Sequence, residues 1–212
     1  FRGQIISAEF VDKHSVEFLA EEIRPKHSGD LLFIELNETF FEDIFENFFM
    51  QIQSINIDDI CEISHSKYSL MRTSIPQAVQ EYNASHKLIK KGTDVQASPE
   101  DFSKLLELYQ DFTKHNVKFT LFGHFGDAHL HFNFLPNESQ KESVDHLLEN
   151  FYKEIASTLT VSPFAEHGIG LIKKNYIKHY YNQTHLDVFK TLKEKHDPQG
   201  IFFPEGFMSF FS

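Results

Sequence analysis

Tryptophan is absent from the chain, cysteine occurs once, and basic residues are outnumbered by acidic ones, 20 against 31. The single cysteine, Cys61, excludes an internal disulfide and fits a reducing compartment, and a free thiol is usually a small buried side chain, here expected on a strand. The formal net charge of −11 would repel phosphate backbones, so nucleic acid is not expected as a partner. No apolar run approaches the length that spans a bilayer. We therefore expect a cytoplasmic protein without a transmembrane segment, with peripheral attachment to the inner face of a membrane as the alternative.

Phenylalanine and histidine are abundant, with 24 and 13 residues among 212. No internal repeat, low-complexity tract or linker-like stretch divides the chain, which predicts one domain over residues 1–212. The chain opens at Phe1 without a methionine, so we expect that the native start lies upstream. Phenylalanines at helical spacing predict a helix over residues 38–52, whose apolar stripe is core or a domain contact. The stripe consists of Phe40, Phe41, Ile44, Phe45, Phe48 and Phe49.

Strand and helix patterns are mixed along the chain. Compact apolar or alternating runs predict strands at 3–11, 31–36, 59–64, 93–97, 117–122 and 129–135. Amphipathic spacing predicts helices at 14–23, 67–82 and 143–159, and a further helix that starts after the cap Ser98. Pro76, inside the second of these helices, predicts a kink or a break. Because strands and helices do not alternate strictly with long crossovers, the pattern favours an α+β fold, with an antiparallel sheet covered by helices.

The segment from Phe122 to Asn133 carries the clearest chemical signal. Along its second strand, apolar side chains alternate with polar ones, so that His129, His131 and Asn133 share one face. A hairpin-like return through the glycine-rich turn would bring His124 beside His131. Two imidazoles that converge from adjoining strands suit a divalent metal. The alternative is a set of surface strand histidines that bond to water or to carbonyl groups.

A second segment, from Ser162 to Gly170, places Glu166 beside His167 and follows them with glycines. Glycine permits positive backbone angles or a close approach of the backbone to a ligand. A carboxylate from this segment would complete a set of two histidines and one carboxylate, which leaves metal positions open for a substrate. The adjacent His167 could then act as a base.

These segments together resemble a known family. The run G-H-x-G-D-x-x-L-H-x-N from Gly123, followed by E-H-G-I-G from Glu166, is similar to the signature of the carboxy-terminal domain of FAD-linked oxidases. That family includes D-lactate dehydrogenases, glycolate oxidase and D-2-hydroxyglutarate dehydrogenase. Further motifs that resemble the family follow its order: I-I-S-A-E-F at 5–10, L-L-F-I-E-L at 31–36, R-T-S-I-P at 72–76, K-G-T-D-V at 91–95 and D-P-Q-G-I at 197–201.

The resemblance implies a ferredoxin-like substrate (cap) domain of a flavoprotein oxidoreductase, which converts a D-2-hydroxy acid to the 2-keto acid with FAD. The metal-binding residues would be His124, His131 and Glu166. Zinc is favoured over manganese and iron because its affinity for such ligands is higher. His167 would be the general base that takes the hydroxyl proton.

The resemblance also assigns the substrate and flavin contacts. Arg72 and Lys91 would hold the substrate carboxylate, for which the planar fork of arginine has matching geometry. Asn133 and Glu166 would lie near the flavin. A flavin-binding domain of the same polypeptide would precede this chain and hold most of the FAD, so the isolated chain would not turn over. An electron acceptor, which the sequence does not identify, would complete the cycle.

The match departs from the family pattern at three places. Ala128 and His129 stand where glycine and asparagine are usual, and Thr160-Val161 replaces a glycine pair. The closing Asn-Pro-Gly-Lys is replaced by F-P-E-G at residues 203–206. This last change motivates the alternative of a divergent metal- or ligand-binding module without redox activity. Zinc as a purely structural staple is a weaker third hypothesis, because the chain offers no four-thiolate or mixed Cys/His set.

Overall fold

A computed structural model describes residues 5–26, 29–37, 46–47 and 59–206 of the chain. These residues belong to two compact units. The first unit comprises Phe1–Gly92 and Asn116–Glu138, and the second comprises Thr93–His115 and Ser139–Ser212. The helix expected over residues 38–52, with its phenylalanine stripe, lies outside the described residues except for 46–47, which are helical.

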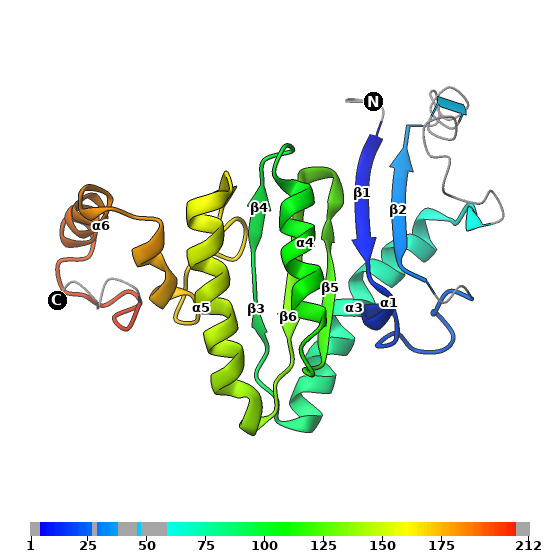
Figure 1. Ribbon diagram of the computed structural model, residues 1–212, viewed down its shortest axis with the longest axis horizontal. Helices are drawn as coiled ribbons and strands as arrows, with labels where there is room; N and C mark the ends of the chain where they lie inside the picture. The colour runs from blue at the N-terminus through cyan, green and yellow to red at the C-terminus, as the bar shows by residue number, and fades with distance from the viewer. Residues whose placement is uncertain (1–4, 27–28, 38–45, 48–58, 207–212) are drawn as a thin grey trace. The chain divides into compact units, whose positions relative to one another are not determined.

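The first unit is built on antiparallel strands in the order β2-β1-β5-β6-β3 (Figure 1). β2 has the bounds that its apolar run predicts, and β5 and β6 form the predicted hairpin through the short helix η3 (Phe125–Asp127). The chain therefore turns back on itself within the segment that carries the histidines. The strands are β1 (Ile5–Val11), β2 (Leu31–Leu36), β3 (Lys91–Gly92), β5 (Phe119–His124) and β6 (His129–Phe134).

One long helix, α3 (His65–His86), packs on the core of the first unit. It begins after Ser64, whose hydroxyl accepts the backbone N–H of Lys67 at 3.3 Å, as a helix cap does. The helix runs on through Pro76 without a break. Its apolar buried side chains recur every three or four residues, so one face of the helix meets the sheet. One cluster of this core consists of Val11, Val16, Leu19, Met71, Ile75, Val79 and Leu135.

Two local predictions in the first unit are wrong. Residues 59–64 form no strand, and Cys61 is exposed. This run leads directly into the cap of α3, and it offers no continuous apolar face for strand pairing to bury. The helix expected at 14–23 is limited to α1 (Lys13–Val16), after which the chain proceeds in turns toward Pro25, a residue type that disfavours helix immediately before it.

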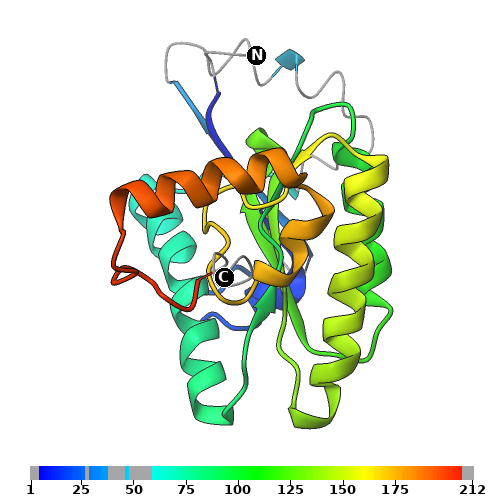
Figure 2. The same cartoon turned by 90° about the vertical axis from the view of Figure 1, so that its left-hand side faces the viewer.

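The second unit combines two short strands with an aromatic core. β4 (Val95–Ala97) and β7 (Val161–Ser162) pair in antiparallel fashion. The helix η5 packs beside α5 (Figure 2), where the rings of Tyr152 and Tyr176 stack with centroids 4.3 Å apart. The helices are η4 (Glu138–Gln140), which precedes α5, and α4 (Phe102–Thr113), α5 (Lys141–Thr158), η5 (Lys174–His179) and α6 (Gln183–His196).

The secondary structure of both units confirms the α+β class. The described residues form seven strands, and the strand pairs within each unit are antiparallel and accompanied by helices. Among the described residues, no helix combines the length and the apolar character that crossing a bilayer requires.

Candidate functional site

Three histidines gather where β5 turns into β6 in the first unit. The strand register places His124 opposite His129, and Phe122 opposite His131. The ring centroids of His129 and His131 are 4.5 Å apart, and those of His124 lie 5.8 Å from His129 and 6.3 Å from His131. The sequence predicted His124 beside His131. The register instead puts His129 directly opposite His124, and His131 lies on the diagonal.

Two of these histidines are inside the protein. His129 and His131 are 3% and 7% exposed, and every residue of β6 is buried. The alternation of polar and apolar residues along this strand therefore does not produce a side that faces solvent. The alternative of surface histidines that bond to water is wrong for these two.

Gly123 allows the two histidine-bearing strands to approach this closely. Its φ is +146°, a backbone conformation that other residues rarely adopt. A Cβ at this position would lie 2.8 Å from the carbonyl oxygen of His129 and 3.2 Å from Cδ2 of His131. The glycine of the G-H pair is thus required by the packing of the histidines themselves.

A buried carboxylate that the sequence analysis did not single out, Glu9, joins His124 to Arg72. Glu9 lies on β1 opposite His124 and is 7% exposed. Nδ1 of His124 is 2.9 Å and 3.1 Å from its two carboxylate oxygens, and Nη2 of Arg72 is 3.3 Å from Oε1. Glu9 is two residues from Val11 on a strand whose one other polar residue is Ser7, and residues two apart share a face. A charged residue that shares a face with an apolar one is the signal that could have identified it.

Lys91 and Asn133 lie on neighbouring strands of the same unit. Lys91 is half-buried on β3 in register with Phe134, and Gly92 is in register with Asn133. Asn133 is 3% exposed, and its Nδ2 donates to Oγ1 of Thr120 at 3.3 Å. This bond joins β6 to β5, so Asn133 contributes to the packing of the first unit whatever else it contacts.

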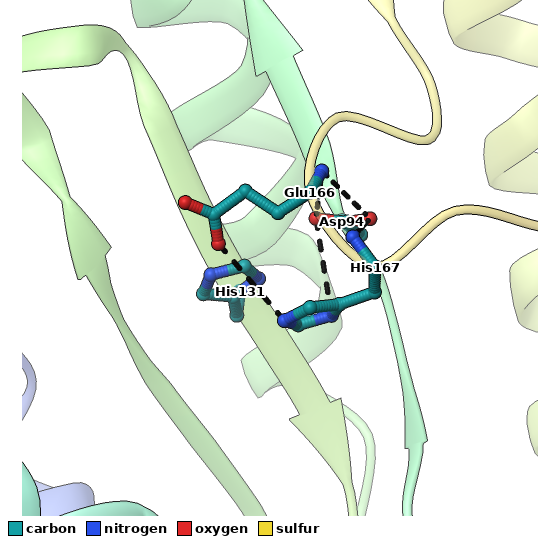
Figure 3. A group of neighbouring side chains, drawn as sticks. All are labelled: Asp94, His131, Glu166 and His167. Carbon is teal, nitrogen blue, oxygen red and sulfur yellow. Dashed lines mark hydrogen bonds and ion pairs between the residues drawn. The ribbon is translucent and has the colours of Figure 1, made fainter.

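In the second unit, Asp94, Glu166 and His167 converge (Figure 3). Each of these side chains offers one potential ligand atom, and these atoms lie within 4.8 Å of one another. The backbone N–H of His167 donates to Oδ2 of Asp94 at 2.8 Å, and the backbone nitrogen of Glu166 is 3.3 Å from both oxygens of that carboxylate. Nδ1 of His167 is 3.9 Å from Oδ1 of Asp94, and its Nε2 is 4.0 Å from Oε2 of Glu166. Figure 3 also labels His131, which belongs to β6 of the first unit.

A buried ion pair supports this loop. The carboxylate of Asp94 is fully buried, and Nζ of Lys173, whose side chain is 8% exposed, lies 2.8 Å from Oδ2. The side chains of Glu166 and His167 are 45% and 54% exposed. Gly168 and Gly170, which follow His167, have positive φ, 64° and 55°, the first of the two uses of glycine that the sequence left open. A buried anchor thus holds an exposed carboxylate and an exposed imidazole on a tightly turned loop.

Asp94 and Lys173 were not predicted as site residues from the sequence, although Asp94 stands in the K-G-T-D-V motif. The charge of Asp94 also affects the pKa of the buried Tyr109. Burial raises the pKa of Tyr109 well above its usual value; a 2.8 Å hydrogen bond with Thr93 opposes this shift, and the charge of Asp94 adds to it.

The described residues therefore provide two sets of polar groups. The first unit holds three imidazoles, one ordered by a buried carboxylate that also binds an arginine. The second unit holds an exposed carboxylate and imidazole on an anchored loop. Imidazole and carboxylate ligands suit zinc, manganese and iron, and an ordered, accessible imidazole suits proton transfer.

Comparison with known proteins gives one family. Residues 2–205 match the family described as FAD linked oxidases, C-terminal domain. A D-2-hydroxyglutarate–pyruvate transhydrogenase of Saccharomyces cerevisiae is 31% identical over 138 residues, which cover 63% of this chain and 28% of that protein. A mitochondrial D-2-hydroxyglutarate dehydrogenase of Arabidopsis thaliana is 24% identical over 219 residues, which cover 95% of this chain and 38% of that protein. The glycolate oxidase subunit GlcD of Bacillus subtilis is 29% identical over 97 residues, 43% of this chain and 20% of that subunit. The chain spans less than two fifths of the length of each of these relatives.

Proposed function

The chain belongs to the family of FAD-linked oxidase C-terminal domains, and from this premise we propose that it binds the substrate of a flavin-dependent dehydrogenase or oxidase. The proposed reaction converts a D-2-hydroxy acid, of the D-lactate, glycolate or 2-hydroxyglutarate type, to the 2-keto acid. The names of these relatives support this substrate class. A flavin-binding domain of the same polypeptide and an electron acceptor are further parts of the proposal.

One observation carries the proposal within the first unit: Arg72 and His124 contact the same carboxylate. A 2-hydroxy acid presents a carboxylate next to a hydroxyl group. A guanidinium that binds the carboxylate and an imidazole that ligates a cation near the hydroxyl would therefore need to lie close together. The shared contact with Glu9 supports this closeness.

Two imidazoles and a carboxylate are donor groups that suit a divalent cation. We propose that His124, His131 and Glu166 hold it, with zinc favoured over manganese and iron by the affinity order. The contact of His124 Nδ1 with Glu9 fits this role, because a metal-ligating imidazole commonly donates its other ring nitrogen to a carboxylate. When bound, the cation would supply a Lewis acid that lowers the pKa of the substrate hydroxyl.

The chain's own residues would then position the substrate and move one proton. Arg72, with Lys91, holds the carboxylate and so fixes the α-carbon. His167 accepts the hydroxyl proton at a ring nitrogen, and the exposure of its side chain, 54%, makes the ring accessible to a substrate. The backbone of His167 stays in place through its 2.8 Å hydrogen bond to buried Asp94.

FAD, when bound, would supply the acceptor for the hydride that leaves the α-carbon. The two proposed flavin neighbours differ in accessibility. The side chain of Glu166 is 45% exposed and can reach a cofactor. Asn133 is 3% exposed and donates to Thr120, so its contribution would come through the packing of β5 and β6.

The test is to produce the chain in its full reading frame and to follow flavin absorbance while 2-hydroxy acids are added without oxygen. Bleaching by one D-acid, slowed by about 10² to 10⁴-fold in His167→Ala, is the expected result. His146→Ala, on an exposed position of α5, is the matched control and should bleach like the wild type. Flavin that no hydroxy acid reduces would rule out the dehydrogenase.

A second candidate, a divergent metal- or ligand-binding module without redox activity, is favoured by the backbone of Phe203. Its φ is +51°, a conformation that asparagine tolerates and phenylalanine adopts rarely. The motif that this chain resembles has asparagine where Phe203 stands, so a residue suited to this backbone angle is replaced by one that adopts it rarely. A full-length protein that binds zinc but no flavin would support this candidate.

A further inference from the structure

Within the described part of the first unit, Glu9 contacts both His124, a proposed metal ligand, and Arg72, the proposed substrate arginine. Glu9 is 7% exposed and lies on β1 directly opposite His124. Both carboxylate oxygens lie near Nδ1 of His124, at 2.9 Å and 3.1 Å, and Oε1 is also 3.3 Å from Nη2 of Arg72. A buried carboxylate is costly to desolvate, so these contacts are needed to offset its burial.

We infer that Glu9 is a positioning residue that orders His124 for cation binding and Arg72 for substrate binding. This inference rests on the proposed function, which assigns those two roles. By accepting a hydrogen bond from the Nδ1–H group of His124, Glu9 selects the tautomer in which Nε2 carries the lone pair that a cation requires. By contacting Nη2 of Arg72, it holds one corner of the guanidinium while 51% of the side chain stays exposed.

Glu9 acts through its neighbours and not on the substrate itself. The cavity beside it, lined in part by Tyr68, Arg72 and Phe122, has a volume of about 30 Å³. A space of this volume has room for a water molecule, whereas pockets for small-molecule ligands have volumes of roughly 300 to 1,000 Å³. A substrate therefore has no room there, and the effect of Glu9 must pass through His124 and Arg72.

Another carboxylate of the same sheet provides a matched comparison. Glu35, on β2, is 3.2 Å from Nδ1 of His65, but the side chain of His65 is 75% exposed. An exposed pair of this kind contributes little to order, because solvent screens it and the side chains remain mobile. The two Glu–His contacts have similar distances, so burial is the difference that gives Glu9 its role.

The test compares Glu9→Gln and Glu9→Asp with Glu35→Gln in the purified chain. In the metal-free chain, the ¹⁵N shifts of the His124 ring report its tautomer, and zinc affinity is measured by competition with a chelator. We expect the wild type to hold the Nδ1–H tautomer. In Glu9→Gln we expect that preference to be lost and zinc to bind about 10 to 100-fold more weakly. Glu9→Asp keeps a carboxylate and should retain part of the tautomer preference and part of the zinc affinity. Glu35→Gln should change neither the tautomer of His124 nor the zinc affinity.

The outcomes separate the inference from the proposed function. If Glu9→Gln folds, as shown by circular dichroism, and keeps both the tautomer and the zinc affinity, the inference is overturned while the proposed function stands. If the wild type binds no zinc, the metal site of the proposed function fails, and the metal-free tautomer measurement still decides whether Glu9 orders His124. A shift in tautomer with unchanged zinc affinity would overturn the link to cation binding.

Discussion

The carboxylate of Asp94 and the ammonium group of Lys173 form a buried ion pair, with Oδ2 and Nζ 2.8 Å apart. The side chain of Asp94 is fully buried and that of Lys173 is 8% exposed. The same carboxylate accepts the backbone N–H of His167. The pair therefore links the buried interior of the second unit to the loop that carries the proposed base.

Removing one member of this pair should destabilise the protein strongly. In Lys173→Met, the buried charge of Asp94 loses the ammonium group that neutralises it, and we expect the free energy of unfolding to fall by about 3 to 5 kcal/mol. Urea denaturation followed by circular dichroism measures this. The double variant Asp94→Asn with Lys173→Met should lose less than the two single variants added together.

An exposed pair is the control for this prediction. Lys114 and Asp111 lie on the surface with side chains 74% and 64% exposed. Lys114→Met should change the free energy of unfolding by under about 1 kcal/mol. A Lys173→Met variant as stable as Lys114→Met would show that the buried pair is not an anchor.

Gly123→Ala should destabilise the first unit and disturb the histidine cluster. The new Cβ would meet the carbonyl oxygen of His129 at 2.8 Å, and the φ of +146° is strained for alanine. We expect a loss of about 1 to 3 kcal/mol in unfolding free energy, measured in urea. Gly29→Ala is the control, because a Cβ there meets no atom within 4 Å. Equal stability of the two variants would contradict the requirement for glycine at position 123.

Alkaline pH should unfold the second unit through its buried tyrosines. Burial raises the pKa of Tyr176 from 10.0 to about 12, and the charges of Asp145 and Glu149 add to the shift. Because the folded pKa is the higher one, the unfolded chain releases this proton first as the pH rises. The stabilisation is complete below about pH 10 and is lost as the pH rises toward 12.

This pH dependence is measured as the free energy of unfolding in urea at several pH values. Tyr176→Phe has no proton to release at this site, so its free energy should fall less steeply between pH 10 and 12 than that of the wild type. Between pH 6 and 8 the two proteins should show parallel curves. Identical slopes in the alkaline range would contradict a raised pKa for Tyr176.

Phe203→Asn should stabilise the protein. Phe203 has a φ of +51°, which costs phenylalanine about 1 to 2 kcal/mol and asparagine less. Phe203 is 55% exposed, so little packing is lost. We expect a gain of about 0.5 to 1 kcal/mol in a thermal or urea melt. Phe202→Asn, at a neighbouring exposed position, should bring no gain, and a loss in Phe203→Asn would show that the phenylalanine ring matters more than the backbone.

Local periodicity predicted much of the first unit. The run L-L-F-I-E-L became β2 with the expected bounds, and the alternating run after Gly126 became β6. The prediction failed at residues 59–64, where an alternation of similar length has no buried face. Short patterns describe which side chains share a face, but they do not show whether another element covers that face.

The sequence by itself determined the family and the α+β class, and it predicted the histidines and the E-H-G-I-G loop as the chemical groups, because motif order and residue type are local properties of the chain. Tertiary structure alone decided that Glu9 meets His124 and Arg72, and that Asp94 anchors His167 through a buried pair with Lys173. These contacts join residues far apart in the chain, and they depend on strand register and on which side chains lose solvent. Neither quantity is encoded by any short segment, since both result from the packing of the whole unit.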